Sequence, residues 1–388
     1  MPGKLVPRCS GQYHPHSAGQ SEKIPCFPAR RQSVKVVDFH PYQTLAGERR
    51  KPLKIPHNLE NGPLILYPSP LTSALIRGIY MHMIIKRLTK WLVRAISVFL
   101  PEEKAHDLQR WRRGREEFWK YNHCQYIFAS YGKSGRTWVR VMISRYYQLV
   151  YKLPDNILMG FDNYTRLNRD IPKIFFTHDN YLRGYTGNVD SKKDFYKKKT
   201  VLLVRNPRDV AVSQFFQWKY RMRPEKKAMN KYPAHEADIS VYDFVKDENQ
   251  GLSHIIEFLN GWARELPKIE NLLVVRYEDL RSHPEREMAK VVEFLGMEAN
   301  DEYLKDMAEF ASVENLRKKE QENYFWRSGS RVQAKDVNDP NTFKVRKAKV
   351  GGYRDYFDDD QVAELDAMVD SRLMPVFGYT RAEIQEAS

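Results

Sequence analysis

The chain has 388 residues, of which 42% are hydrophobic, and it carries a formal net charge of +15 at pH 7. This length and apolar content suffice for one large domain with a buried core plus additional segments, which excludes a chain that is disordered throughout. The positive charge suits an anionic cofactor, an anionic acceptor or a membrane surface. No zinc-finger, RNA-binding or helix-turn-helix signature accompanies it, so nucleic acid is not an expected partner.

Cysteine usage favours a reducing compartment. The three cysteines, Cys9, Cys26 and Cys124, offer no disulfide framework, and no Cys/His cluster has the spacing of a zinc site. We therefore expect a cytoplasmic protein that needs no metal.

The N-terminal residues differ in character from the rest. Residues 1–72 contain scattered proline and basic residues with little periodicity, which predicts a poorly ordered extension. No apolar stretch of a secretory signal follows the first methionine. An alternative is that synthesis begins near Met81 or Met83.

Residues 73–100 predict a basic amphipathic helix, followed by the main domain at residues 101–388. A membrane span is not predicted, because charges interrupt any apolar run of the roughly 18 residues that a span needs. Residues 74–100 either pack their apolar side on the main domain or contact a membrane surface. The interrupting charges are Arg77, Lys86, Arg87, Lys90 and Arg94.

The stretch YIFASYGKSGRTWVRVMISR, residues 126–145, predicts an apolar strand at 126–131, a turn, and a helix at 137–150. The start of such a helix favours an anion, because its first N–H groups are unpaired and its dipole is positive there. Gly132 and Gly135 let the backbone approach closely. Lys133 adds a mobile cation, while Ser134 and Thr137 add hydroxyl donors. The turn therefore predicts a site for a phosphate-like anion.

An ATP- or GTP-binding Walker loop is the first interpretation to test against this turn. That motif requires glycine six residues before its lysine, and this position holds Ile127. Only half of the motif is present. A magnesium-dependent P-loop kinase stays open as the alternative enzyme.

A second anion site is predicted by residues 199–213, KTVLLVRNPRDVAVS, in which a buried strand again runs into a helix. Asn206 and Pro207 supply an N-cap and a first-turn proline. Arg205 lies where the strand ends, and Ser213 lies about two turns along the helix. Both side chains can then reach one phosphate.

The fold class predicted is α/β, a P-loop-like parallel sheet flanked by helices on both faces. Short apolar strands that alternate with helices are typical of this arrangement. The binding crevice should lie at the carboxyl ends of the strands, where both anion loops fall. The predicted strands are 126–131, 174–177, 200–204 and 272–276, and the predicted helices are 137–150, 207–220, 252–265 and 284–295.

These motifs together resemble the cytosolic-type sulfotransferases that use 3′-phosphoadenosine 5′-phosphosulfate (PAPS). The resemblance spans roughly residues 120–375 and rests on five segments in the family's order. They are YGKSGRTW at 131–138, TH at 177–178, VRNPRDVAVS at 204–213, YEDL at 277–280 and VRKAKVGGY at 345–353.

The resemblance implies sulfuryl transfer from PAPS to a hydroxyl, or less often an amine, of a small molecule, glycan or lipid. His178 would be the general base, and Lys133 would neutralise the leaving adenosine 3′,5′-bisphosphate (PAP), without a metal. Oligomeric state is not predicted. The residues implied to bind the donor are Lys133, Ser134, Gly135, Arg136, Thr137, Trp138, Arg205, Ser213, Tyr277, Arg346, Lys347 and Ala348.

Several of these residues have a structural alternative. Thr177 and His178 could pack or cap, and Trp138 could belong to the helix core. Tyr277 is ambiguous at a strand end, and Arg346 and Lys347 could be surface charge. The place of His178 between the two anion motifs favours catalysis, and the place of Arg346 and Lys347 before Val350-Gly-Gly352 favours a phosphate contact. The resemblance implies that Trp138 lies against the adenine, while Tyr277 stays ambiguous.

The sequence also departs from the family pattern. Phe176 stands where the best-known members carry a sulfate-contacting lysine, and Arg136 stands where the loop usually has threonine. Lys344 replaces an aromatic residue and Ala348 replaces a glycine. These departures leave a non-catalytic nucleotide-binding relative as a third hypothesis. Acceptor specificity is expected from the loops at 161–168, 179–187 and 222–232.

Overall fold

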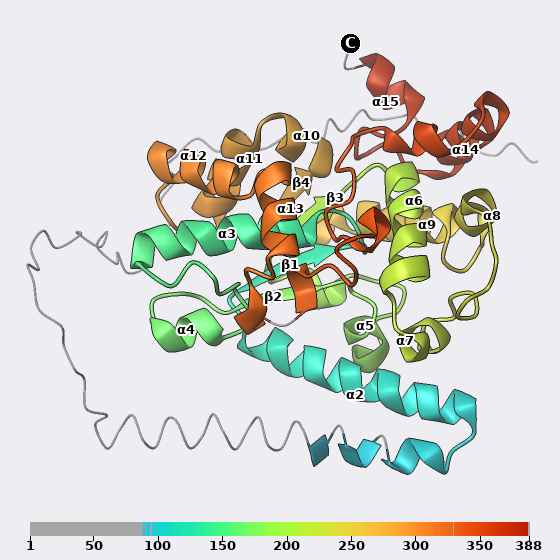
Figure 1. The fold of residues 1–388 in the computed structure, drawn as a ribbon, viewed down its shortest axis with the longest axis horizontal. Coiled ribbons are helices and arrows are strands. Elements are labelled where there is room, and N and C mark those ends of the chain that lie inside the picture. The colour runs from blue at the N-terminus through green and yellow to red at the C-terminus, as the bar shows by residue number, and fades with distance from the viewer. Residues whose placement is uncertain (1–87, 90, 94, 329, 387–388) are drawn as a thin grey trace, which may run out of the picture. The chain divides into compact units, whose positions relative to one another are not determined.

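The computed structural model describes residues 88–386 except 90, 94 and 329 (Figure 1). The predicted extension at 1–72, and most of the predicted amphipathic helix at 73–100, therefore lie outside the described residues. Within 88–98 the described residues are helical. In the part of the chain that is described, no helix is both long and apolar enough to cross a membrane.

Four parallel strands form the sheet, in the order β2-β1-β3-β4. They are β1 (Tyr126–Ser130), β2 (Ile174–Thr177), β3 (Lys199–Val204) and β4 (Leu272–Arg276). The chain crosses from β1 to β2 on one side and reaches β3 on the other side of β1. The strand order thus reverses direction between β1 and β3, which is where α/β sheets open a binding crevice.

The strands are apolar runs because both faces of the sheet are covered. In β1, Ile127 and Ala129 face one hydrophobic core and Phe128 faces the other. In β3, Leu202 and Val204 alternate in the same way with Val201 and Leu203, which face the opposite core. The predicted parallel sheet with helices on both faces is confirmed.

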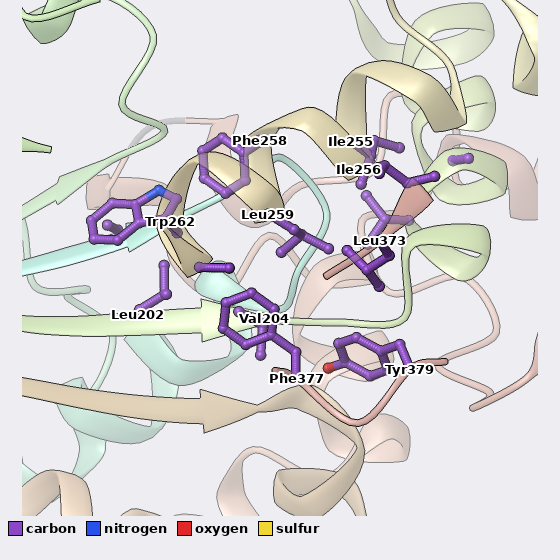
Figure 2. Close-up of a cluster of buried hydrophobic side chains, with 14 of the residues drawn as sticks. Leu202, Val204, Ile255, Ile256, Phe258, Leu259, Trp262, Leu373, Phe377 and Tyr379 are labelled. Carbon is purple, nitrogen blue, oxygen red and sulfur yellow. The ribbon is translucent and has the colours of Figure 1, made fainter. Parts of the chain in front are cut away.

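The first core lies between β3 and the helices α6 (Pro207–Phe216), α9 (Leu252–Ala263) and α14 (Asp359–Arg372). Figure 2 shows Leu259 and Trp262 of α9 close to Leu202 and Val204 of β3. Leu373, Phe377 and Tyr379, which follow α14, complete this cluster. The C-terminal residues are therefore part of the domain core.

The second core lies under α3 (Arg136–Tyr151), α11 (Pro284–Phe294) and α12 (Asp301–Phe310), which group together in Figure 1. Among its largest members are Tyr146 and Tyr147 of α3, which are almost fully buried. Tyr146 Oη also donates to the carbonyl of Glu298 at 2.7 Å, which ties α3 to the segment before α12.

A long helix that the sequence analysis did not include, α2 (Glu102–His123), packs against α5 (Leu182–Thr186) and α7 (Pro224–Met229). The contact is close at Gly114, where an added Cβ would lie 2.6 Å from Tyr185 Cβ. From residue 102 to residue 386, the described residues also form the α-helices α4 (Asn163–Leu167), α8 (Val241–Lys246), α10 (Tyr277–Ser282), α13 (Val313–Gln321) and α15 (Arg381–Glu386).

Most predicted boundaries agree with the structure to within two residues, with one exception. The helix predicted at 207–220 is α-helical only to Phe216 and continues as a π-helical turn, Gln217–Arg221. The loop predicted at 222–232 contains α7, in which Lys227 is 2% exposed. The polar composition of this segment gave no indication of a helix, because the burial of one helix face depends on contacts with distant residues.

Candidate active site

A cavity of about 770 Å³ opens at the carboxyl ends of the strands. Each of the four strands delivers a lining residue to it: Lys133 follows β1, His178 follows β2, Arg205 follows β3 and Tyr277 follows β4. This is the edge at which the strand order reverses. The two predicted anion motifs therefore meet in one cavity.

The turn between β1 and α3 has the backbone shape of an anion loop. Lys133 and Gly135 adopt positive φ angles of 71° and 94°. A Cβ at Gly135 would also lie 2.8 Å from Tyr277 Cδ2, so glycine is required here twice over. The first helical hydrogen bond runs from Val139 N to Gly135 O at 3.1 Å, so earlier N–H groups lack an intrahelical partner and suit an anion.

Lys133 lies in a cationic environment. Burial, followed by the charges of Lys344, Arg221 and Arg205, holds its pKa well below the usual range. Its charged form is therefore disfavoured until an anion enters. Binding of a phosphate or sulfonate group would restore the ammonium and strengthen the contact.

Arg205 is fixed by several contacts at the end of β3. Its guanidinium lies 4.2 Å from the centre of the Tyr277 ring, donates to the carbonyl of Lys133 at 3.2 Å and pairs with Asp209 at 3.7 Å. Its Nε has no hydrogen-bond partner within the described residues. Ser213 of α6 lines the same cavity. The predicted N-cap is confirmed, since the Asn206 side chain accepts from Arg208 N at 3.0 Å.

His178 is held in one tautomer by two neighbours. Its Nδ1 lies 2.9 Å from the carbonyl oxygen of Ser130, and its Nε2 lies 2.6 Å from Nη2 of Arg136. Arginine only donates, so Nε2 must accept and Nδ1 must carry the hydrogen. Burial and then Arg136 hold the pKa of His178 well below its usual value. The imidazole is thus neutral at neutral pH, and its lone pair is capped by Arg136.

Two aromatic rings form one wall of the cavity. Trp138 and Tyr277 pack edge to face, with ring centroids 5.8 Å apart. Trp138 Nε1 donates to the carbonyl of Ala311 at 2.8 Å, and Arg281 lies 5.5 Å from its ring centre. Trp138 is therefore a wall residue with a fixed orientation and not simply helix core.

The loop before Gly351 closes another side. Arg346 lies 3.6 Å from the centre of the Phe216 ring, and Lys347 pairs with Asp355 at 3.2 Å. Ala348 has a φ of 53°, the left-handed conformation that glycine adopts freely. The replacement of the family glycine by Ala348 thus keeps the backbone conformation at a cost of roughly 1 kcal/mol.

Of the predicted site residues, only Ser134 stays outside this cavity lining. Its side chain is 3% exposed. The structure brings the other predicted residues together, while their individual roles stay predictions. The lining members are Lys133, Gly135, Arg136, Thr137, Trp138, His178, Arg205, Ser213, Tyr277, Arg346, Lys347 and Ala348.

Sequence analysis missed a carboxylate beside the general-base candidate. Glu117 of α2 accepts hydrogen bonds from Leu182 N at 3.0 Å and from Thr177 Oγ1 at 3.3 Å. Burial raises its pKa to about 7. Glu117 therefore fixes the residues on either side of His178. Nothing in the charged sequence of α2 distinguished it from its neighbours.

Arg140 was also missed. It is 6% exposed, lies 3.8 Å from the centre of the Phe176 ring and donates to the carbonyl of Met159 at 2.8 Å. Arg136 and Arg140 are four residues apart, so they share one helix face. The four-residue spacing of Arg136 and Arg140 was the sequence signal from which Arg140 could have been predicted to lie near the cavity.

Comparison with known proteins gives a family match. The sulfotransferase domain matches residues 188–377. The chain is 25% identical over 276 residues to cytosolic sulfotransferase 14 of Arabidopsis thaliana, covering 64% of this chain and 74% of that protein. It is 25% identical over 273 residues to flavonol 3-sulfotransferase of Flaveria bidentis, covering 66% and 84%. A mouse sulfotransferase complexed with PAP is similar at 20% identity and a TM-score of 0.46, covering 69% and 90%.

Proposed function

We propose that the chain is a PAPS-dependent sulfotransferase in which His178 is the general base and transfer to the acceptor is in line. The sulfotransferase domain match at residues 188–377 and the cytosolic and flavonol sulfotransferases among its relatives support this proposal. The observation that carries this proposal is the tautomer of His178. Ser130 and Arg136 together require a neutral ring with its lone pair on Nε2. That nitrogen belongs to a side chain that lines the cavity, as a proton acceptor must.

The donor set of the cavity fits PAPS. The loop at 131–135 and Lys133 suit a phosphosulfate group, and Arg205 with Ser213 suits the 3′-phosphate. Arg205 Nε and Arg136 Nη1 have no hydrogen-bond partner among the described residues, so both are available to anionic oxygens. When bound, PAPS supplies an activated sulfuryl group. Trp138 and Tyr277 offer ring faces and edges for its adenine.

Proton transfer requires that Arg136 leave His178. Nε2 has a single lone pair, and Arg136 Nη2 occupies it at 2.6 Å. An acceptor hydroxyl can donate to Nε2 only after this contact breaks. The proton of the hydroxyl then passes to Nε2 as its oxygen attacks. Arg136, once released, can stabilise negative charge in the cavity.

Lys133 complements this step from the other side. Its pKa is depressed by burial and neighbouring cations, so an entering anion favours its protonated form. The ammonium then offsets the charge that develops on the leaving oxygen. This role needs no group beyond the residues of the chain.

For the acceptor we propose a chemical class, and for the location we propose a cellular compartment. Relatives include a flavonol 3-sulfotransferase, which supports a small-molecule hydroxyl as acceptor, while glycans, lipids and amines stay within the proposal. A relative described as a cytosolic sulfotransferase supports a cytoplasmic location. Peripheral membrane contact through residues 74–100 stays a prediction.

Calorimetric titration tests the proposal. Wild-type protein should bind PAP without a metal, and His178→Gln should bind PAP equally well but lose transfer of labelled sulfate to acceptors. Binding of ATP with magnesium in place of PAP would favour the kinase alternative. Intact PAP binding together with no turnover by the wild type in a broad acceptor screen would favour the non-catalytic relative.

A further inference from the structure

The cavity holds more positive charge than its phosphate motifs account for. Fourteen lysine and arginine side chains line it, against three carboxylates. Two of these carboxylates already have partners. Asp179 pairs with Lys192 at 2.6 Å. Asp209 pairs with Arg205 at 3.7 Å and accepts from the backbone N–H groups of Gly351 and Tyr353, each at 2.9 Å. The cavity is therefore strongly cationic.

One group of cations lies on the His178 side of the cavity, and two of its members also face the proposed donor site. Arg136 belongs to the anion loop, and Lys344 lowers the pKa of Lys133. Arg136, Arg140, Arg331 and Lys344 line the cavity on the side of His178. Arg136 contacts His178 directly at 2.6 Å, and Lys344 is near enough to lower the pKa of His178. Arg331 is near enough to lower the pKa of both Arg136 and Arg140. We call these four side chains the His178 cation cluster. Lys226, which also lines the cavity, likewise lowers the pKa of His178.

Two carboxylates lie near the His178 cation cluster, Glu117 near Arg136 and Glu320 near Lys344, but burial and the neighbouring cations outweigh their effect on the pKa of these two side chains. Within the described residues none of its members forms an ion pair with a carboxylate, although Arg205, Arg221 and Lys192 nearby each do. Arg136 Nη1 is buried without a hydrogen-bond partner. Burial and then Arg221 lower the pKa of Lys344 to about 7. Like charges gathered in this way are costly unless an anion joins them.

We infer that the acceptor carries, besides its reacting hydroxyl, a fixed negative charge that Arg136, Arg331 and Lys344 bind. This inference rests on the proposed function. The shared chemistry is that of a carboxylate, sulfate or phosphate group, each of which suits a cluster of arginine and lysine donors.

The charge of the acceptor also has a task in the reaction. Arg136 caps the lone pair of His178 Nε2, and its Nη1 is free for a second partner. An anionic group beside Arg136 competes for the guanidinium and draws it away from the imidazole. The hydroxyl of the same acceptor then meets an uncapped base. A neutral acceptor leaves Arg136 in place and is a poor substrate.

Two measurements test the inference. In the first, protein saturated with PAP is titrated calorimetrically with inorganic sulfate. Wild type should bind this second anion, and the double variant Arg331→Gln/Lys344→Gln should bind it at least about tenfold more weakly while keeping its affinity for PAP. Lys305→Gln, at an exposed position outside the cavity lining, should match wild type.

In the second, initial rates with labelled PAPS are compared for three phenols that differ only in the para substituent. They are 4-hydroxyphenylacetate, 4-hydroxyphenyl phosphate and methyl 4-hydroxyphenylacetate. The anionic phenols should have kcat/KM values about tenfold above that of the neutral ester. Comparing the carboxylate phenol with the phosphate phenol shows which of the two anionic groups the cavity prefers. The double variant should lose this preference.

The inference is overturned if PAP-saturated wild type binds no sulfate, if the double variant loses PAP as severely as Arg205→Ala, or if the neutral ester is preferred. The second outcome would assign the cations to the donor. Failure of wild type to bind PAP at all would instead reject the proposed function, so the two failures are distinguishable.

Discussion

Replacing Arg205 with alanine should weaken PAP binding by about two orders of magnitude. The side chain ends β3, lines the cavity and has a free Nε, so its planar fork can give two hydrogen bonds to one phosphate. A hydrogen bond to a charged group contributes about 1.5–3 kcal/mol. Losing two hydrogen bonds of about 1.5 kcal/mol each reduces the binding free energy by about 3 kcal/mol. This loss raises the dissociation constant roughly 150-fold.

The surrounding contacts indicate that the fold tolerates this change. Asp209 would lose its 3.7 Å ion pair with Arg205 but keep the hydrogen bonds from Gly351 N and Tyr353 N. Its carboxylate therefore stays satisfied in place, and its charge would further disfavour an incoming phosphate. Stacking on Tyr277 is also lost, which contributes about 1 kcal/mol. We expect weaker binding with little loss of folded protein.

The assay is calorimetric titration with PAP at one fixed salt concentration, because phosphate contacts are screened by salt. Arg205→Lys keeps a point charge without the fork, so it should fall between wild type and alanine. Arg169→Ala, at an exposed position outside the cavity lining, is the matched control. If folded Arg205→Ala binds PAP within about threefold of wild type, Arg205 does not hold a phosphate and the assignment of this motif is wrong.

Three further predictions concern the base and the helix beside it. His178→Gln keeps an acceptor for Arg136 but cannot take a proton, so kcat should fall by about 10²–10⁴ at unchanged PAP affinity; a variant that keeps full activity would exclude general-base catalysis by this residue. Burial and Arg136 lower the pKa of His178, and the ring is active when neutral. Arg136→Gln should therefore move the acid limb of the kcat/KM profile to higher pH, and an unmoved limb would contradict the contact. Gly114→Ala places a Cβ 2.6 Å from Tyr185 Cβ and 2.8 Å from Tyr181 O, so urea unfolding should show a loss of about 1–3 kcal/mol. Gly184→Ala meets nothing within 4 Å and is the control; equal stabilities would mean that α2 can shift away from α5.

Local sequence was sufficient for the strands, the turns and the caps. Each depends on neighbours in the chain: an apolar run predicts a strand buried on both faces, Gly-Lys-Ser-Gly predicts a turn, and Asn206-Pro207 predicts a helix start. The turn lies between β1 and α3, and Asn206 is the cap. Because carboxyl ends of parallel strands share one edge, the meeting of the two anion motifs also followed from the sequence.

The contacts that give the cavity its character join residues far apart in the chain, and no local pattern encodes them. Arg136 and His178 are separated by 42 positions, so the capped base could not be read from either motif alone. Glu117 reaches Leu182 from α2 across 65 positions, and Lys344 lies near His178 only because its loop folds back over the cavity. Ser134 is 3% exposed and is not among the residues that line the cavity, and its contact with a ligand stays a prediction. Periodicity and turn chemistry act over a few residues, whereas the orientation of a charged side chain depends on which distant elements pack around it.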